Sequence, residues 1–394
     1  MDAPLRDRRA ARGFSLVELL VAIVLAVIVL GAGMVGAAIA ADLSADYQVT
    51  SADRDESRLA ALASGFPLAT QVVDLADGDV VAGLCRDADL VIGAVPGYLG
   101  FQTLRAVIEA GKPVVDISFF GQDPFELDAL AQRLGVTAVV DCGVAPGLSN
   151  MILGYHASRE TVTSFRCLVG GLPVKRVLPW QYKAPFSPVD VLEEYTRPAR
   201  LVENGCIVTR PALSDAELVD IEPAGTLEAF NTDGLRSLLV TMRQVPDMVE
   251  KTLRYPGHIE YVRVLRDAGF FSADPIRIGG VEVRPIDLAA ALLLPQWRLE
   301  PAEAEFTLME VAVRMNDRTV TYRLYDTTDE KTGISSMART TGYTATAAAR
   351  LLLRGQFTRK GICPPEYVSA APGCFDSVLS DLDARRVRVQ RIES

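Results

Sequence analysis

Between residues 25 and 145, apolar runs with the length of a strand alternate with segments that have the length of a helix. The apolar run 26–30 predicts a buried strand, and the small and apolar residues 37–43 predict a helix. Residues 47–53 and 87–96 predict two more strands. Because strands and helices recur at this spacing, we expect an α/β fold with a parallel, doubly wound sheet.

The pattern continues with further elements along the chain. Asp123 is a helix cap followed by Pro124 at the first helical position, and Ser149 or Asn150 caps the helix after Pro146-Gly147. Helices are expected over 100–110, 125–134, 234–242 and 344–355, and strands over 111–118, 136–141, 161–170, 205–210, 278–284 and 305–314.

A glycine-rich turn links the first strand to the first helix. Gly31, Gly33 and Gly36 form the pattern G-x-G-x-x-G, and about 20 residues later the second strand ends on Asp53. Gly31 permits the tight turn, Gly33 lets a pyrophosphate approach the backbone, and Gly36 lets helix and strand pack. The helix N-terminus offers N–H groups to the anion. We infer a Rossmann-type dinucleotide-binding domain.

The acidic residue after the second strand bears on the choice of cofactor. Asp53 accepts hydrogen bonds from ribose hydroxyls and repels a 2′-phosphate, which favours NAD over NADP. The next residue, Arg54, is a cation that could contact a phosphate, and it therefore weakens the case for NAD. The predicted cofactor contacts are Gly31, Gly33, Met34, Val35, Gly36, Asp53, Arg54, Ala94, Val95, Pro96 and Gly143.

Composition narrows the class of protein. The 394 residues are 49% hydrophobic and carry a formal charge of −10 without long runs of one sign. A nucleic-acid-binding protein needs a basic face, so we expect no nucleic-acid partner. The six cysteines are scattered without a C-x-x-C pair, which predicts reduced thiols, no metal site and a cytoplasmic location.

The N-terminus conflicts with this picture. Basic residues precede Gly13-Phe-Ser-Leu-Val-Glu18, and the sequence resembles a type IV prepilin leader cleaved after Gly13. The apolar run that follows has the length of a membrane helix, so residues 14–41 invite a membrane prediction. The strand and glycine turn occupy its second half, and we therefore consider that prediction spurious. Residues 1–24 are interpreted as an extension from a fused reading frame or a misassigned start.

Six separated motifs stand out along the rest of the chain. They are Asp141-Cys-Gly-Val-Ala-Pro-Gly147, Val169-Gly-Gly-Leu-Pro-Val174, Gly225-Thr-Leu-Glu-Ala-Phe-Asn-Thr-Asp233, Lys251-Thr-Leu-Arg-Tyr-Pro-Gly-His258, Met337-Ala-Arg-Thr-Thr-Gly-Tyr343 and Thr358-Arg-Lys-Gly-Ile-Cys-Pro-Pro-Glu366. Together they resemble the saccharopine dehydrogenase superfamily, and within it the bacterial lysine 6-dehydrogenases. The similarity runs in register over residues 26 to 375.

This resemblance implies an inserted α+β domain that carries the substrate pocket and the contacts of a homo-oligomer. The expected division is 1–24 extension, 25–145 NAD(P)-binding domain, 146–336 substrate and oligomerisation domain, and 337–394 a segment that returns to the Rossmann domain.

Oxidative deamination of a lysine side chain needs a cation for the α-carboxylate, an acceptor for the α-ammonium, and a base or proton relay for the ε-amine. Arg254 and His258 are the first choices for carboxylate binding and proton relay. His258 also fits a turn-stabilising role.

Other residue pairs offer further candidates. The set Asn231, Thr232 and Asp233 binds the substrate ammonium or caps the helix that follows. Tyr182 is a candidate to line the pocket, and Lys183 is a candidate cation site or base, or else a solvated loop residue. The lysine 6-dehydrogenase pattern lacks this lysine. Asp116, at the carboxyl end of a strand, is another acid-base candidate, and Arg339 is a weak candidate for positioning cofactor or substrate.

The leading hypothesis is an NAD-dependent dehydrogenase that converts L-lysine to its 6-semialdehyde. The alternatives are a saccharopine or carboxynorspermidine-type reductase that works through an imine and a membrane-tethered, pilin-like protein. Saccharopine carries an extra glutamate moiety and needs more cations, for which Arg176, Lys183, Arg236 and Arg254 are candidates.

Overall fold

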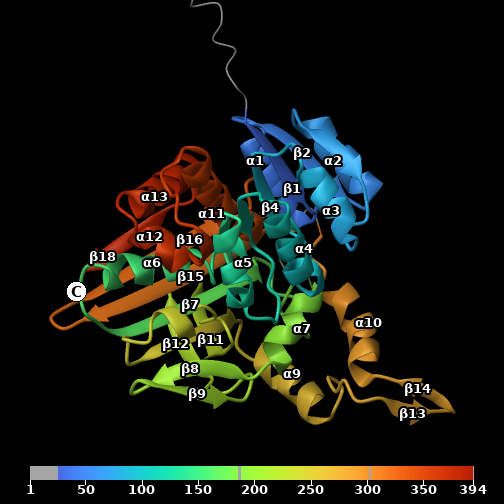
Figure 1. Ribbon diagram of the computed structural model, residues 1–394. Helices are drawn as coiled ribbons and strands as arrows, with labels where there is room; N and C mark the ends of the chain where they lie inside the picture. Colours follow the sequence, from blue (N-terminus) through green and yellow to red (C-terminus); the bar gives the residue numbers. More distant parts are fainter. Residues whose placement is uncertain (1–24, 185–187, 301–302, 394) are drawn as a thin grey trace, which may run out of the picture.

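The computed structural model describes residues 25–184, 188–300 and 303–393. Two sheets dominate it: a parallel sheet built mainly from the first 140 residues, and a larger mixed sheet built mainly from the middle of the chain (Figure 1). The fold is therefore α/β with a Rossmann-type sheet and an added α+β unit, as the sequence predicts.

The parallel sheet has seven strands in the order β17-β6-β5-β4-β1-β2-β3. The first strand lies inside the sheet, where it pairs with β2 on one side and β4 on the other. Its residues 27–30 are buried, which explains the uninterrupted apolar run. The strands are β1 Ala26–Leu30, β2 Gln48–Asp53, β3 Ala69–Val72, β4 Leu90–Gly93, β5 Val114–Asp116, β6 Thr137–Val139 and β17 Gly361–Cys363.

Helices connect these strands, and acidic side chains begin several of them. Asp55 accepts hydrogen bonds from the backbone N–H groups of Ser57 and Arg58, and Asp123 accepts from Phe125. The helices are α1 Met34–Leu43, α2 Glu56–Gly65, α3 Gly78–Cys85, α4 Gly97–Glu109, the 3₁₀-helix Pro124–Leu127 and α5 Asp128–Arg133.

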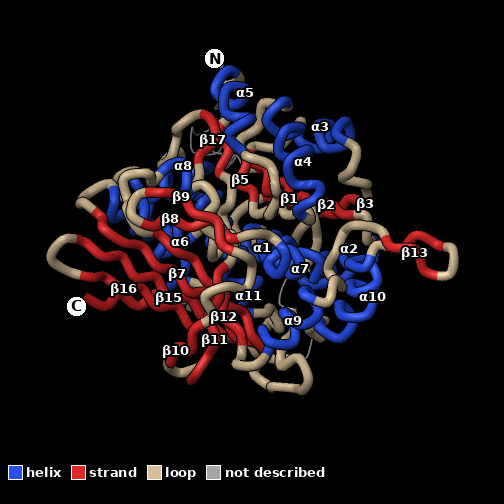
Figure 2. Tube along the Cα trace, turned by 90° about the horizontal axis from the view of Figure 1, so that it is seen from below, coloured by secondary structure: helices blue, strands red, loops and turns tan. Residues whose placement is uncertain are grey.

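The mixed sheet runs in the order β10-β11-β12-β7-β15-β16-β18; off this path β8 pairs with β12, and β9 pairs with β8. Figure 2 shows these long strands side by side. The strands are β7 Val162–Pro173, β8 Ala199–Glu203, β9 Cys206–Arg210, β10 Glu217–Ile221, β11 Gly225–Asn231, β12 Met248–Arg254, β15 Glu305–Met315, β16 Thr319–Thr327 and β18 Val389–Glu393.

Helices pack against this second sheet, and a separate small hairpin between α9 and α10 projects from the molecule (Figure 1). Helix α11 packs against α1 and thereby joins the two halves of the molecule. The helices are α6 Leu148–Ala157, α7 Pro188–Thr196, α8 Leu238–Thr241, α9 His258–Asp267, α10 Pro285–Trp297, α11 Ser336–Leu353, α12 Pro365–Ala370 and α13 Cys374–Ala384, and the hairpin strands are β13 Ile276–Ile278 and β14 Val281–Val283.

The C-terminal part of the chain contributes to both sheets. β17 extends the parallel sheet by pairing with β6, whereas β18 pairs with β16 in the mixed sheet. The expected return to the Rossmann domain therefore describes β17 and not the last strand.

Several predicted elements have different bounds. The helix expected over 344–355 begins at Ser336, because the Ser335 side chain accepts a hydrogen bond from Ala338 N–H. The helix expected over 234–242 is only α8, and the strand expected over 278–284 is instead a short hairpin. Gly147 precedes α6, and Asn150 Oδ1 accepts from its N–H, so neither Ser149 nor Asn150 is the cap residue.

The apolar run near the N-terminus has two outcomes. Residues 1–24 lie outside the described residues. From Ala26 onward the run forms β1, the glycine turn and α1, so the sheet interpretation of this part is confirmed. Within the described part of the chain, no helix combines the length and apolarity that crossing a bilayer requires.

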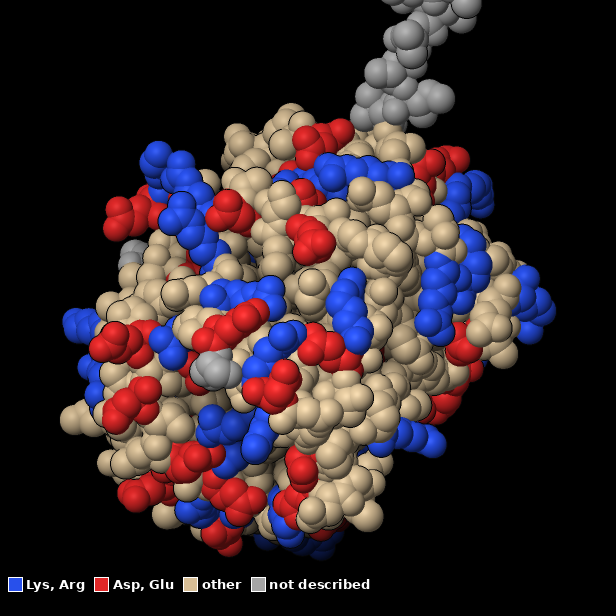
Figure 3. Space-filling view, turned by 90° about the vertical axis from the view of Figure 1, so that its left-hand side faces the viewer, with Lys and Arg blue, Asp and Glu red and all other residues tan. Residues whose placement is uncertain are grey.

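Surface charge of both signs is mixed. On the face drawn in Figure 3, Lys and Arg side chains alternate with Asp and Glu side chains. Exposed ion pairs of the molecular surface include Arg318–Glu160 and Arg210–Glu203.

Candidate active site

A cavity of about 1500 Å³ lies between the carboxyl edge of the parallel sheet and the mixed sheet. All the residues predicted to bind the cofactor, from Gly31 to Gly143, line this cavity on the side of the parallel sheet. Of those predicted to act on the substrate, only Thr232, Asp233 and Arg254 line it. The remaining five, His258, Asp116, Lys183, Tyr182 and Asn231, do not.

The glycine turn has the geometry that a bound pyrophosphate requires. Gly31 has φ +108°, and a Cβ there would lie 2.4 Å from the backbone oxygen of Ala94. A Cβ on Gly36 would lie 2.1 Å from the oxygen of Gly31, whereas a Cβ on Gly33 would meet no atom within 4 Å. A side chain at Gly31 or Gly36 would therefore clash with nearby backbone atoms. The space beside Gly33 is open, and a diphosphate fits there.

Asp53 closes the turn from the neighbouring strand. Its Oδ2 accepts a hydrogen bond of 2.6 Å from Ala32 N–H, and its Oδ1 accepts one of 2.9 Å from Asp55 N–H. The carboxylate is therefore held in place at the cavity wall. Arg54 and Arg58 also line the cavity there, and Arg58 is paired with Asp55.

Strand β12 supplies much of the other half of the cavity. Side chains two residues apart on a strand share a face, and Glu250, Thr252 and Arg254 all face the cavity. Lys251, between them, instead donates hydrogen bonds to the Asp215 oxygen and Glu217.

Arg254 is buried and held by several groups. It donates to Glu194 Oε2 at 2.7 Å, to the Tyr195 hydroxyl at 3.1 Å and to the Tyr182 hydroxyl at 3.3 Å. The guanidinium lies 4.3 Å from the centre of the Tyr182 ring. Because Glu194 also lines the cavity, the pair presents a cation and an anion side by side, which suits the carboxylate and ammonium of an amino acid.

His258 lies behind this pair. Its Nδ1 is 2.8 Å from the Trp180 oxygen and its Nε2 is 3.0 Å from the Tyr195 hydroxyl. Burial and the nearby Arg254 lower the pKa of His258 to about 3. A neutral ring that donates from Nδ1 and accepts at Nε2 satisfies both contacts. The ring does not line the cavity, so His258 has no direct contact with a substrate for the predicted proton relay.

The other substrate candidates have partners of their own. Asp233 lines the cavity but receives three hydrogen bonds from Arg200. Asn231 donates to Ser214 and Asp215, and Lys183 lies 3.7 Å from Glu303. The set 231–233 does not cap a helix, since α8 begins later and Ser237 precedes it.

Asp116 is the last residue of β5, opposite Gly93 of β4 in the sheet, and is fully buried. Its Oδ1 accepts from Ser118 N–H, and burial raises the pKa of Asp116 well above its usual value. Beside it, the ion pair between Asp141 and Arg236 joins the parallel sheet to the second domain. Arg236 is therefore paired with Asp141 and does not line the cavity in which a substrate would bind.

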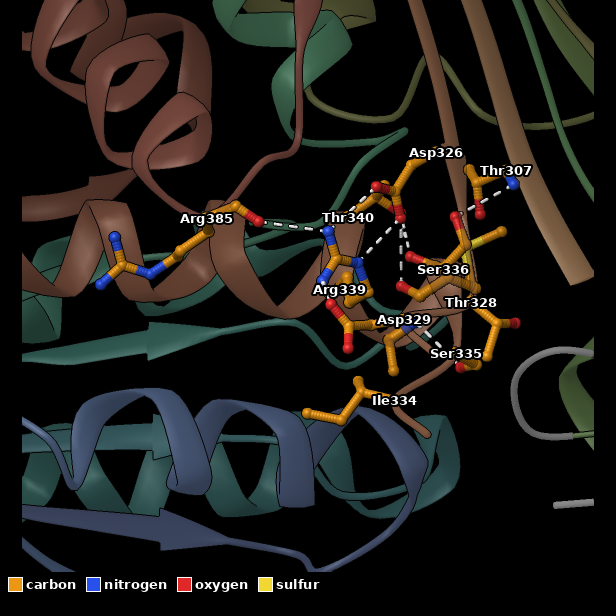
Figure 4. Close-up of polar contacts among 12 residues, drawn as sticks. Thr307, Asp326, Thr328, Asp329, Ile334, Ser335, Ser336, Arg339, Thr340 and Arg385 are labelled. Carbon is orange, nitrogen blue, oxygen red and sulfur yellow. Dashed lines mark hydrogen bonds and ion pairs between the residues drawn. The ribbon is translucent and has the colours of Figure 1, made fainter. Parts of the chain in front are cut away.

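Arg339 anchors the segment that borders the cavity before α11. Figure 4 shows its guanidinium between Asp326, Asp329 and the backbone oxygen of Arg385. Residues 328 and 333–335 of this segment line the cavity. Arg339 therefore positions a wall of the cavity without lining it.

The sequence interpretation missed several cavity residues. They are Asp141, Glu194, Arg197, Glu250, Thr252 and Arg298. A usable signal was present for two of them, since Glu250, Thr252 and Arg254 occupy alternate positions of one strand. Glu194 and Arg298 come from helix α7 and the end of α10, which only the tertiary fold brings to the cavity.

Comparison with known proteins places the geometry in a family. The family model described as "Saccharopine dehydrogenase C-terminal domain" matches residues 143–387, and "Saccharopine dehydrogenase NADP binding domain" matches 27–139. "Prokaryotic N-terminal methylation motif" matches 8–34, in agreement with the resemblance of the N-terminus to a prepilin leader.

Individual relatives agree. The chain is 26% identical over 240 residues to saccharopine dehydrogenase [NADP(+), L-glutamate-forming] of Schizosaccharomyces pombe, covering 57% of this chain and 53% of that protein. It is 28% identical over 250 residues to mouse alpha-aminoadipic semialdehyde synthase, covering 59% of this chain and 27% of that protein. The matched region thus spans about half of the yeast relative's length.

The structure of apo saccharopine dehydrogenase (L-Glu forming) from Saccharomyces cerevisiae shares the fold. It superposes with a TM-score of 0.74 at 22% identity, over 94% of this chain and 100% of that chain. The first of the family models covers more than half of the 394 residues. The chain therefore belongs to the saccharopine dehydrogenase family.

Proposed function

We propose that this protein is a nicotinamide-dependent oxidoreductase that acts on the carbon–nitrogen bond at the side-chain end of a lysine-derived amino acid, with L-lysine as the first candidate. The observation that carries the proposal is a single cavity in which the glycine turn of one sheet faces the Glu250, Thr252 and Arg254 wall of the other. Family membership supports the class of reaction.

The fit of the cofactor rests on this chain's own backbone. Open space at Gly33, between two glycines that tolerate no Cβ, supplies the cradle for a diphosphate. Asp53 and residues 94–96 border the path toward Gly143. When bound, a nicotinamide dinucleotide accepts a hydride from the carbon that bears the nitrogen. The fixed carboxylate of Asp53 supports NAD, although the matching family model is that of an NADP-binding domain.

The charges of the cavity support L-lysine. Arg254 offers a cation to the α-carboxylate and Glu194 an acceptor to the α-ammonium. Glu250 lies four residues earlier on the same strand, about 13 Å away along the backbone. The wall therefore has separate places for the head group and for a remote amine.

Saccharopine is the second candidate, because the relatives are saccharopine dehydrogenases. It carries more carboxylates than lysine. Of the four cations that the sequence offered for them, only Arg254 lines the cavity; Arg236 is paired with Asp141, Lys183 lies 3.7 Å from Glu303, and Arg176 donates to Gln181. Arg197 and Arg298 also line the cavity, so further cations border the space that the extra carboxylates would occupy.

The test is a matrix of substrates and cofactors. Purified protein is mixed with NAD or NADP and with L-lysine, saccharopine or a diamine, and the absorbance of the reduced cofactor is followed. Turnover of L-lysine with NAD is expected. Turnover of saccharopine but not L-lysine would favour the second candidate, and no turnover with any amine would refute the proposal. The cytoplasmic location and homo-oligomer stay predictions, and fractionation of cells tests the membrane-tethered alternative.

A further inference from the structure

Glu250 is a carboxyl group placed on the cavity wall by the strand pattern of β12. It is 6% exposed, and it lies opposite Cys167 of β7 in the register of the sheet. Gly234 packs directly against it, since a Cβ on Gly234 would lie 2.3 Å from Glu250 Oε2. The carboxyl is thus enclosed on the protein side and open only toward the cavity.

Two hydroxyl groups connect to this carboxyl. Thr232 donates to Glu250 Oε2 at 2.6 Å, and the Thr252 hydroxyl lies 2.8 Å from that of Thr232. All three residues line the cavity. When the carboxyl is ionised, the hydroxyls donate toward it; when it is protonated, the same chain can reverse direction.

The two carboxylates near Glu250, those of Asp233 and Glu194, accept hydrogen bonds from arginines. Asp233 receives three hydrogen bonds from Arg200, and Glu194 receives one from Arg254. Among the described residues, the contacts of Glu250 are with hydroxyl and backbone groups and not with a cation. Burial, together with the negative charges of Glu194 and Asp233, raises the pKa of Glu250 to about 8. A carboxyl with such a pKa changes protonation near the operating pH, as acid-base catalysis requires.

The earlier acid-base candidates lack this combination. Neither His258 nor Asp116 lines the cavity, and both ring nitrogens of His258 already have partners in Trp180 and Tyr195. Lys183 does not line the cavity either and lies 3.7 Å from Glu303.

We infer that Glu250 is the acid-base residue for the reacting nitrogen, and that Thr232 and Thr252 form its proton relay; this inference rests on the proposed function. In the oxidative direction, the N–H bond of the substrate ammonium breaks and an O–H bond forms on Glu250. The nitrogen keeps its electron pair and becomes a neutral amine, whose neighbouring carbon can release hydride. The proton then passes by way of Thr232 to Thr252, which lines the cavity, and from there to solvent water that enters the cavity.

The first test is Glu250→Gln, which keeps the size of the side chain and can still accept from Thr232. We expect kcat to fall by about 100- to 10 000-fold, with cofactor binding, followed by the fluorescence of the reduced cofactor, unchanged. Glu366→Gln is the matched control: Glu366 is also a buried carboxyl bonded to a threonine, Thr241, but it does not line the cavity. Its kcat should match that of the native protein.

The pH profile gives a readout that a structural role would not produce. In the native protein, kcat/KM for the oxidation should rise with pH through about 8, and Glu250→Gln should abolish this rise. The hydrogen bond from Thr232 lowers the pKa of Glu250, so Thr232→Val should move the rise to higher pH and Thr232→Ser should restore it. Infrared difference spectra between about pH 6 and pH 10 should show a protonated carboxyl that is lost in Glu250→Gln, independently of turnover.

The outcomes separate the two claims. If the native protein turns over no amine, the proposed function fails and the relay with it. If it turns over L-lysine or saccharopine, and Glu250→Gln keeps both the rate and the pH profile, only the role of Glu250 is refuted.

Discussion

The buried ion pair between Asp141 and Arg236 should hold the two domains in register, and its removal should cost several kcal/mol. Arg236 Nη2 lies 2.8 Å from Asp141 Oδ1, Nε lies 3.2 Å from both carboxylate oxygens, and Nη1 donates to the Phe120 oxygen at 2.6 Å. The two side chains are 5% and 2% exposed. Both residues have positive φ, 52° for Asp141 and 50° for Arg236, a conformation that Asp adopts more readily than Arg.

The magnitude follows from this geometry. At 2.8 Å and an effective dielectric constant of about 20, the gross Coulomb attraction is about 6 kcal/mol. Desolvation of both groups offsets much of it. Arg236→Met leaves the carboxylate buried without its partner, and such losses cost about 3–5 kcal/mol. Asp141→Asn leaves the guanidinium unpaired and should also destabilise the fold.

A double-mutant cycle measures the coupling. Urea unfolding followed by circular dichroism gives the free energy of unfolding of the native protein, of Arg236→Met, of Asp141→Asn and of the double variant. We expect the double variant to lose less than the sum of the single losses, by about 1–3 kcal/mol. Losses that add to within about 0.5 kcal/mol would refute the argument that the pair acts as a unit.

Three further predictions follow from single contacts. Asp53→Asn keeps an acceptor for Ala32 N–H but removes the negative charge, so the affinity for NADP relative to NAD should rise about tenfold in fluorescence titrations; an unchanged ratio would contradict the role given to the carboxylate. Because the folded-state pKa of His258 is lowered to about 3, the unfolded chain binds a proton that the folded chain does not, and stability should fall as the pH drops below about 6.5. Calorimetry should show a weaker dependence in His258→Gln, and an equal dependence would show that the ring is charged in the fold. Gly93→Ala places a Cβ 1.9 Å from Asp116 Oδ2 and should lower the stability by about 1–3 kcal/mol in urea unfolding, whereas Gly83→Ala, where a Cβ meets nothing within 4 Å, should not.

The cofactor half could be predicted from the sequence because its chemistry is local. Gly31, Gly33 and Gly36 lie in one turn, and the strand that ends on Asp53 pairs directly with the strand before that turn. Periodicity and glycine spacing report such short-range relations well.

The substrate half depends on contacts between distant segments. Arg254 and Glu194 are 60 positions apart, and Arg236 and Asp141 are 95 apart. Residue type alone does not tell which carboxylate each arginine will meet. His258 attracted attention because histidine titrates near neutrality, but burial removes that property in the fold.

Because β17 pairs with β6, the cofactor domain is built from two segments that are far apart in the sequence. Thr137 donates to the oxygen of Arg359, 222 positions later, and Asp128 accepts from Ile362 N–H. A fragment cut after residue 145 would lack its seventh strand and expose the edge of β6, so it should aggregate instead of folding alone. Supplying residues 337–393 as a separate polypeptide offers a route to reassemble the domain by fragment complementation.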